Sequence, residues 1–189
     1  MDQTAILQTL MMSDPLRRQA LEAVAELDLP DCWIGAGFVR DALWAHLHGN
    51  DVTVPRGDVD VIWYNTAQPE ESRDRSIEQS LRIKMPCLSW SVKNQARMHH
   101  RNGDDPYASV SDAMQHWPET ATAVAVRLGR SGAVEVNAPF GLRDLFALRL
   151  QPTPNFLTTK HPIFMDRVNS KRWLERYPLL SLGDRHSGS

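Results

Sequence analysis

The run from residue 58 to residue 64 constrains the fold of this chain more than any other segment. It reads Asp-Val-Asp-Val-Ile-Trp-Tyr, so acidic and β-branched residues alternate at its start. This alternation is typical of a β-strand with one face in the core. On a strand, residues i and i+2 share a face, about 6.6 Å apart at Cα. The segment therefore predicts a strand with Asp58 and Asp60 on one face. The residues expected in the core are Val59, Val61 and Trp63.

A Gly-Ala-Gly turn at residues 35–37 precedes this strand, and residues 38–48 then carry apolar side chains at helical spacing. Gly35 and Gly37 allow the backbone to approach a ligand closely. The N-terminus of the following helix offers free N–H groups and a positive dipole end to a phosphate. Arg40 lies one turn into the helix, within reach of a phosphate oxygen. The sequence thus predicts a phosphate-binding turn, in which Arg40 is either a phosphate ligand or the ion-pair partner of a neighbouring acid.

Paired carboxylates beside a phosphate-binding turn favour metal-assisted attack on a nucleotide phosphate. Magnesium prefers one or two carboxylates together with substrate phosphates, and carboxylates two residues apart on a strand can bracket a pair of ions. A third acid is expected to bind the second ion and to deprotonate the acceptor. The candidate is Glu135, which lies between two valines. The open alternatives are a solvated edge-strand face for Asp58 and Asp60, and an ordinary exposed strand position for Glu135.

The other segments predict an α+β fold, a small mixed or antiparallel sheet with flanking helices. The apolar runs 121–128 and 133–136 flank a glycine-containing turn and predict an antiparallel hairpin. Helices are expected over residues 15–28, 70–83, 89–101, 113–117, 142–150 and 163–177. Asp14 can cap the first of them, and Ser109 with Asp112 offers a cap before the helix at 113–117. We expect one domain over residues 1–182, with helices at its N-terminus and a C-terminal helical extension, followed by a frayed polar tail over residues 183–189.

A further candidate is the polar stretch within the helix expected over residues 89–101. On a helix, Lys93 and Arg97 would share one face, because they are four residues apart. They would bind phosphate or an acceptor there, and we assign Lys93 to the nucleotide. The alternative is a solvated helix face.

Composition excludes several classes of protein. The chain has 21 basic and 23 acidic residues, so no overall positive charge steers it to nucleic acid. No apolar run approaches the ~20 residues that span a bilayer, and the N-terminus has no secretory pattern. Cys32 and Cys87 have no partners at zinc spacing, and we expect both to be reduced core thiols of a cytoplasmic protein.

These motifs resemble those of known enzymes. The segments 35–41 (Gly-Ala-Gly-Phe-Val-Arg-Asp) and 58–60 (Asp-Val-Asp) resemble the signature of the polymerase-beta-type nucleotidyltransferase superfamily, and the Val-Arg-Asp element is closest to that of tRNA-terminal CCA-adding enzymes. The rest of the chain resembles a small bacterial nucleotidyltransferase-like family. The segments that match it are 90–99, 117–124 and 138–146, and the resemblance covers residues 15 to 156.

The resemblance implies a polymerase-beta-like fold and transfer of a nucleoside monophosphate from an NTP, with Asp58 and Asp60 as metal ligands and Gly35 and Gly37 as the phosphate turn. Ala36 displaces the second glycine of the usual pair. We therefore expect an Mg²⁺-dependent enzyme, with Mn²⁺ as the alternative, that uses a two-metal mechanism. Its acceptor is an unidentified hydroxyl of a small molecule, a protein or RNA. The alternative is an inactive nucleotide-binding sensor of the same fold, favoured if Glu135 lies away from the carboxylate pair.

Overall fold

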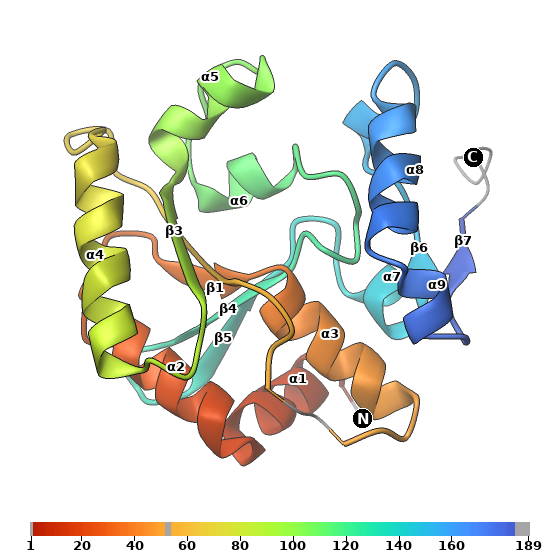
Figure 1. Cartoon of the computed structure of the whole chain (residues 1–189), viewed down its shortest axis with the longest axis horizontal. Helices are drawn as coiled ribbons and strands as arrows, with labels where there is room; N and C mark the ends of the chain where they lie inside the picture. Colours follow the sequence, from red (N-terminus) through yellow and green to blue (C-terminus); the bar gives the residue numbers. More distant parts are fainter. Residues whose placement is uncertain (1, 52–53, 184–189) are drawn as a thin grey trace.

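A computed structural model describes residues 2–51 and 54–183. Within these ranges the central sheet holds five strands in the order β3-β2-β1-β4-β5 (Figure 1). β2 and β3 are parallel, and the other neighbouring pairs are antiparallel. This mixed sheet with flanking helices confirms the predicted α+β class. The strand bounds are β1 (Trp33–Gly35), β2 (Val59–Trp63), β3 (Trp90–Asn94), β4 (Ala125–Leu128) and β5 (Val134–Asn137).

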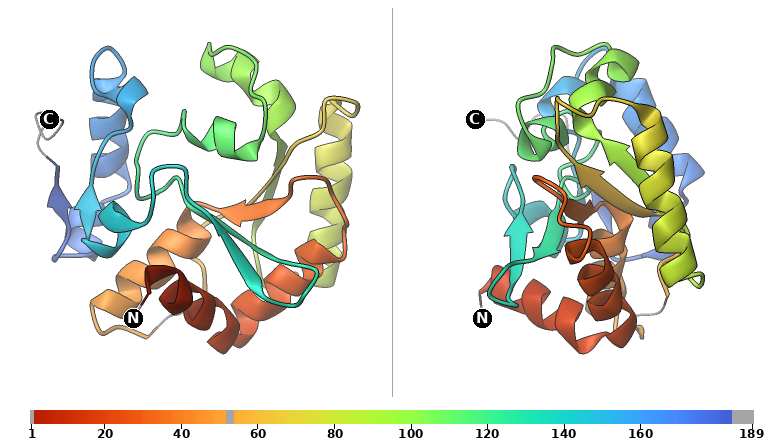
Figure 2. Two further views of the ribbon diagram at one scale, coloured as in Figure 1. Left: turned by 180° about the vertical axis from the view of Figure 1, so that it is seen from behind. Right: turned by 90° about the vertical axis from the view of Figure 1, so that its left-hand side faces the viewer.

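Four helices cover one face of this sheet, and Figure 2 shows α1 and α2 beneath the β4–β5 hairpin. Their bounds are α1 (Gln3–Ser13), α2 (Pro15–Ala25), α3 (Gly37–Leu47) and α4 (Glu71–Lys84). Asp14 caps α2, because its carboxylate accepts the Leu16 N–H at 3.0 Å and Pro15 suits the first turn. The sequence predicts this cap correctly, although α2 ends three residues earlier than expected.

The main core lies between these helices and the sheet. Val59, Val61 and Trp63 are fully buried in it, as the alternation in β2 predicts. A smaller apolar cluster on the opposite face includes Trp33 and Ile62 and is covered by α6 (Val110–Met114). β2 is therefore buried on one face along its whole length and on the other face only beyond Asp60. This half-covered strand leaves Asp60 facing open space.

The C-terminal part of the chain stands on the far side of that space from α5 (Met98–Asn102) and α6 (Figure 1). Its central contact is Trp173, which is fully buried and whose ring packs edge-on against Trp44 of α3 at 6.0 Å. The elements of this part are α7 (Arg143–Phe146), β6 (Arg149–Leu150), a 3₁₀ turn (Pro154–Phe156), α8 (His161–Ser170), α9 (Trp173–Arg176) and β7 (Ser181–Leu182).

The prediction of a helix over residues 89–101 is wrong for the first half of that segment. Residues 90–94 form β3, a 3₁₀ turn follows over Gln95–Arg97, and only α5 is helical. In β3, Trp90 and Val92 are buried against the same core as Val59 and Val61. Pairing with β2 supplies the backbone hydrogen bonds and burial that outweigh the helical pattern of the polar residues.

Three smaller expectations need correction. The helix expected over 163–177 is divided, because Arg172 adopts a left-handed conformation with φ of 51° between α8 and α9. The segment 142–150 holds a helix of four residues and a short strand. Cys87 is exposed, whereas Cys32 is buried as expected. Of the predicted frayed tail, residues 184–189 lie outside the described residues.

Candidate active site

Asp58 and Asp60 lie in a narrow cleft of about 250 Å³, here called the carboxylate lobe. Asp60 belongs to β2 and is mostly buried, whereas Asp58 precedes the strand and is exposed. The Ser89 hydroxyl donates a hydrogen bond to Asp58 Oδ1 at 2.6 Å. The valines on either side of Asp60 are fully buried and anchor the strand. The structure therefore brings the two predicted acids into one lobe on a rigid element.

Burial, and to a smaller extent the negative charge of Asp58, raise the pKa of Asp60 from 3.8 to about 6. Arg40, Lys171 and Arg167 oppose this effect. The carboxyl group is thus poorly solvated and lies in a field of nearby cations. A divalent cation at this position would favour the charged carboxylate and offset the cost of its desolvation.

The N-terminus of α3 opens into the same lobe. No side chain in the described ranges caps this end of the helix, and Gly37 is its first residue. Ala36 has φ of 55° and ψ of −126°, a conformation in which glycine is normally found. An uncapped helix N-terminus provides N–H donors for a phosphate. The turn therefore has the geometry of an anion-binding site, with the strained position at Ala36.

Gly35 serves a different purpose from the one the sequence suggests. A Cβ added there would lie 3.2 Å from Trp117 Cη2 and 3.4 Å from both Ala125 Cβ and Ile62 Cδ1. Close packing of the Trp117 indole therefore favours glycine at position 35. Gly37 does line the lobe, where its added Cβ would lie 3.3 Å from the side chains of Arg40 and Asp41.

Arg40 is held by structural contacts. Its Nε donates to Asp41 Oδ1 at 2.9 Å, and its Nη1 donates to Thr122 Oγ1 at 2.8 Å. Its guanidinium also lies 4.5 Å from the ring centre of Trp173. The ion-pair alternative raised from the sequence is therefore realised, and Arg40 joins α3 to α9 at the wall of the carboxylate lobe.

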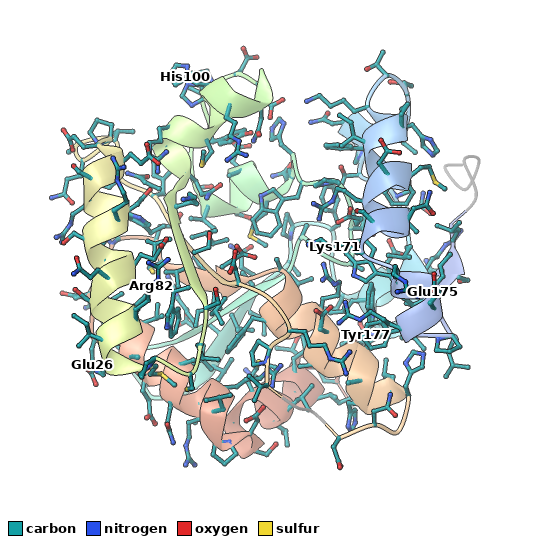
Figure 3. All side chains as sticks on the ribbon, viewed as in Figure 1. Glu26, Arg82, His100, Lys171, Glu175 and Tyr177 are labelled. Atoms are coloured by element: carbon teal, nitrogen blue, oxygen red, sulfur yellow. The ribbon has the colours of Figure 1, made fainter. Side chains whose placement is uncertain are left out.

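Two cations from α8 and its C-terminal cap also line the lobe, and sequence reasoning missed both. Arg167 donates to Glu119 Oε1 at 2.7 Å, and Glu119 is fully buried. Lys171 is exposed, lines the lobe and has no ion-pair partner within residues 2–51 and 54–183. Figure 3 shows Lys171 between α8 and α3. No local motif marks Lys171, because its proximity to Asp60 depends on how α8 packs.

Glu135 does not join the carboxylate pair. The register places Gly35 opposite Asp60, Ala125 opposite Gly35, and Asn137 opposite Ala125. Glu135 lies on the third strand from β2 and two residues along from Asn137, so it is more than about 14 Å from Asp60 at the usual strand spacing. It accepts a hydrogen bond from Arg127 Nε at 2.6 Å instead. The prediction of a cluster of three carboxylates is wrong, because two strands separate the hairpin edge from β2.

The described ranges hold no group of three or more His, Cys, Asp or Glu residues able to bind a metal ion. Two carboxylates still fit Mg²⁺, which binds through one or two carboxylates and takes its other ligands from phosphates and water. Asp58 and Asp60 would hold such an ion. The nearest position on the neighbouring strand is Ser91, the register partner of Asp60.

A second, wider cavity of about 680 Å³ continues from the carboxylate lobe and is here called the wide lobe. Asp60 and Arg167 line both. Lys93 lines the wide lobe from β3, where it is the register partner of Ile62. It does not line the carboxylate lobe, so the structure separates it from the phosphate-binding turn, although the sequence assigned both to the nucleotide. The prediction that Lys93 and Arg97 share a helix face is wrong, because Lys93 lies on β3 and Arg97 forms an ion pair with the buried Asp74.

No helix in the described part of the chain is long and apolar enough to cross a membrane.

Comparison with known proteins gives a consistent result. A family model described as a nucleotidyltransferase matches residues 22–182. A protein whose NMR structure reveals a CCA-adding enzyme head domain superposes with a TM-score of 0.84 at 29% identity, over 94% of this chain and 94% of the other. No curated protein matches the sequence.

More distant solved structures share the fold. A CCA-adding enzyme in complex with ATP superposes with a TM-score of 0.58 at 16% identity, over 94% of this chain and 42% of that enzyme. The Thermotoga maritima CCA-adding enzyme complexed with tRNA superposes with a TM-score of 0.57 at 15% identity, over 96% of this chain and 42% of that enzyme. The chain therefore spans less than half the length of these two enzymes.

Proposed function

This chain belongs to a nucleotidyltransferase family, as its motifs predict, and on that premise we propose that it transfers a nucleoside monophosphate from an NTP to a hydroxyl acceptor in the presence of Mg²⁺. The observation that carries the proposal is the carboxylate lobe. It combines Asp58 and Asp60, the N-terminus of α3 and the ammonium group of Lys171, which has no ion-pair partner among the described residues. These are the groups needed to hold a cation and a polyphosphate side by side.

Each of these groups has a separate part in the proposed reaction. The backbone N–H groups at the start of α3 bind the terminal phosphates, and Lys171 neutralises charge on the departing pyrophosphate. Asp58 and Asp60 would hold the cation, which would polarise the phosphate and favour deprotonation of the acceptor hydroxyl. The bond between the acceptor oxygen and the α-phosphorus forms as the bond to pyrophosphate breaks. Arg40 keeps the lobe in shape through Thr122 and Trp173.

The two-metal form of this mechanism rests on two protein carboxylates. Any second ion would take its remaining ligands from the substrate phosphates and water, because Glu135 is about three strand spacings from Asp60. The position of Glu135 also favours the second candidate function, in which the same lobe binds Mg²⁺ and an NTP without transfer. Release of pyrophosphate distinguishes the two functions.

The test begins with thermal denaturation of the wild-type protein with MgCl₂, with ATP or CTP, and with both together. We expect synergistic stabilisation that Asp58→Asn and Asp60→Asn lose. Asp105→Asn, which removes an exposed carboxylate outside the cleft, should retain it. Equal stabilisation of wild type and of Asp60→Asn would contradict the proposed metal site.

The second step uses α-labelled NTPs, Mg²⁺ and a cell extract as the source of acceptor. A labelled product, formed with pyrophosphate and absent with Asp60→Asn, supports the transferase. Synergistic binding without a labelled product or pyrophosphate supports the binding module instead.

A further inference from the structure

The wide lobe is continuous with the carboxylate lobe and has the size of a small-molecule site. Ala36, Asp60, Thr122 and Arg167 line both cavities. Its volume of about 680 Å³ lies within the range of roughly 300–1,000 Å³ that is usual for small-molecule pockets. Asp60 therefore stands at the junction between a polyphosphate site and a second cavity that the nucleotide phosphates do not need.

The wide lobe carries more positive than negative charge. Lys160 and Arg167 line it but are compensated, by Asp104 at 3.3 Å and by Glu119 at 2.7 Å. Lys93 and Arg101 also line it, and neither has an ion-pair partner in the described part of the chain. Two uncompensated cations in a concave site are unexpected for a chain with a formal charge of −2. They indicate an anionic ligand.

The direction of attack assigns that ligand a place in the reaction. In phosphoryl transfer the attacking and leaving oxygens lie on opposite sides of the phosphorus. If the leaving pyrophosphate is bound by α3 and Lys171 in the carboxylate lobe, the attacking hydroxyl must come from the other side of Asp60. The cavity on that side is the wide lobe.

The shape of the wide lobe favours a small acceptor. Lys160, at the N-terminus of α8, contacts Asp104 and the Asn102 carbonyl at 3.3 Å each. These contacts tie α8 to the segment after α5 across the cavity that Lys160 lines. A bridge across the cavity suits a ligand of metabolite size better than a polymer.

We propose that the wide lobe binds the acceptor, and that the acceptor is a small alcohol bearing its own phosphate group, which Lys93 and Arg101 hold. This inference rests on the proposed function. The acceptor oxygen bonds to the α-phosphorus of the NTP, pyrophosphate leaves, and the hydroxyl proton passes to solvent water. The product is a phosphodiester that retains the acceptor's own phosphate group.

The test uses calorimetry on the full chain, saturated with Mg²⁺ and the non-hydrolysable analogue α,β-methylene-ATP. The probes are ribose 5-phosphate and glycerol 3-phosphate, each compared with its unphosphorylated parent. We expect at least one phosphorylated probe to bind saturably and its parent to bind at least about tenfold more weakly, because charge-assisted contacts to phosphate are lost. The double variant Lys93→Gln/Arg101→Gln should lose the same factor for that probe.

The controls separate this inference from general charge effects and from the proposed function. The matched variant Arg75→Gln/Arg130→Gln removes two exposed cations outside the cleft and should bind the probe like wild type. Both double variants should bind the ATP analogue as wild type does. If the wild type fails to bind the analogue, the proposed function is wrong. The probes are then titrated into the nucleotide-free protein, where binding that needs Lys93 and Arg101 still identifies the anion site.

Several results would overturn the inference. One is the absence of saturable binding of either phosphorylated probe to wild type, and another is equal binding by the Lys93→Gln/Arg101→Gln variant. Displacement of the probe by the ATP analogue would assign the wide lobe to the nucleotide itself. A short oligoribonucleotide that binds more tightly than both probes through the same two cations would assign it to an RNA end.

Discussion

Asp60 on β2 and Ser91 on β3 are register partners, so their side chains leave the same face of the sheet and enter the same cleft. Ser91 therefore occupies the position from which a third carboxylate would reach Asp60. Glu135 cannot take this position, because it lies on the opposite edge of the sheet. The geometry thus identifies where a complete acidic cluster can be built.

Replacing Ser91 with Asp should couple the stability of the protein to divalent metal. Without metal, we expect a loss of about 1–2 kcal/mol in the free energy of unfolding at neutral pH, because a third charge faces Asp60. Adding Mg²⁺ or Mn²⁺ should restore this loss. Urea denaturation with EDTA or with metal measures both effects. Ser91→Asn is the control, and an equal metal response in the two variants would contradict the predicted geometry.

The raised pKa of Asp60 predicts a pH dependence of stability without metal. Since this pKa is raised, mainly by burial, from 3.8 to about 6, the Asp60 carboxyl binds a proton more tightly in the folded state than in the unfolded state. The contribution of Asp60 to the free energy of unfolding should therefore be largest below about pH 4. It should fall by up to about 3 kcal/mol as pH rises through 6. Asp60→Asn should lack this fall, in urea titrations with EDTA. Asp105→Asn should follow the wild-type curve, and parallel curves for wild type and Asp60→Asn would refute the assignment.

Replacing Ala36 with glycine should stabilise the protein. The φ of 55° at Ala36 is unfavourable for a residue with a Cβ, so Ala36→Gly removes strain that exceeds the added entropy of the unfolded chain. We expect a gain of roughly 1 kcal/mol, measured by urea denaturation. Within α3, near its C-terminal end, the same change, Ala45→Gly, should cost up to about 1 kcal/mol. A loss of stability in both variants would mean that Ala36 is not strained.

Glu135→Gln should leave the response to Mg²⁺ and NTP unchanged. Glu135 is exposed, and its partner is Arg127 on the neighbouring strand. Loss of that surface ion pair should cost less than about 1 kcal/mol in the free energy of unfolding. Thermal shifts with and without ligand, compared with Asp60→Asn, measure this. If Glu135→Gln abolished the ligand-induced shift, the separation of Glu135 from the site would be wrong in solution.

Lys171→Ala should weaken NTP binding by about tenfold, because an unpaired cation beside a polyphosphate contributes a charge-assisted contact. Lys171→Arg should retain most of the affinity. The control is Lys84→Ala, which removes a cation paired with Glu26, and Figure 3 shows Glu26 far from Lys171. Calorimetry with Mg²⁺ and a non-hydrolysable analogue tests the three variants. Affinity that is unaltered in Lys171→Ala would remove this residue from the proposed mechanism.

Local signals account for the parts of the fold that could be predicted. Alternation over residues 58–64 predicted β2, and the cap at Asp14 predicted the start of α2. The second case of local capping is Ser109, whose hydroxyl accepts the Asp112 N–H at 3.0 Å. The helix that it caps, α6, begins directly after it at Val110 and ends at Met114, three residues earlier than the expected range 113–117. In each case the preference is decided by residues within a few positions of one another.

β3 shows where local reasoning failed. Its polar residues allow a helix, but Trp90 and Val92 gain burial only by pairing with β2, and that pairing is a contact between distant segments. This error also changed the role of Lys93. On a helix it would have shared a face with Arg97, whereas on β3 it faces the wide lobe and Arg97 pairs with Asp74.

The sequence alone determined that two carboxylates share a strand face and that a glycine-containing turn and a helix precede them, because both features depend on neighbouring residues. Only the tertiary structure decided which other groups meet the pair. The strand order removed Glu135 from the site, the packing of α8 brought Lys171 to it, and the β2–β3 register placed Ser91 beside it. The physical reason is that contacts between distant segments follow from strand order and helix packing, which no local pattern of side chains specifies.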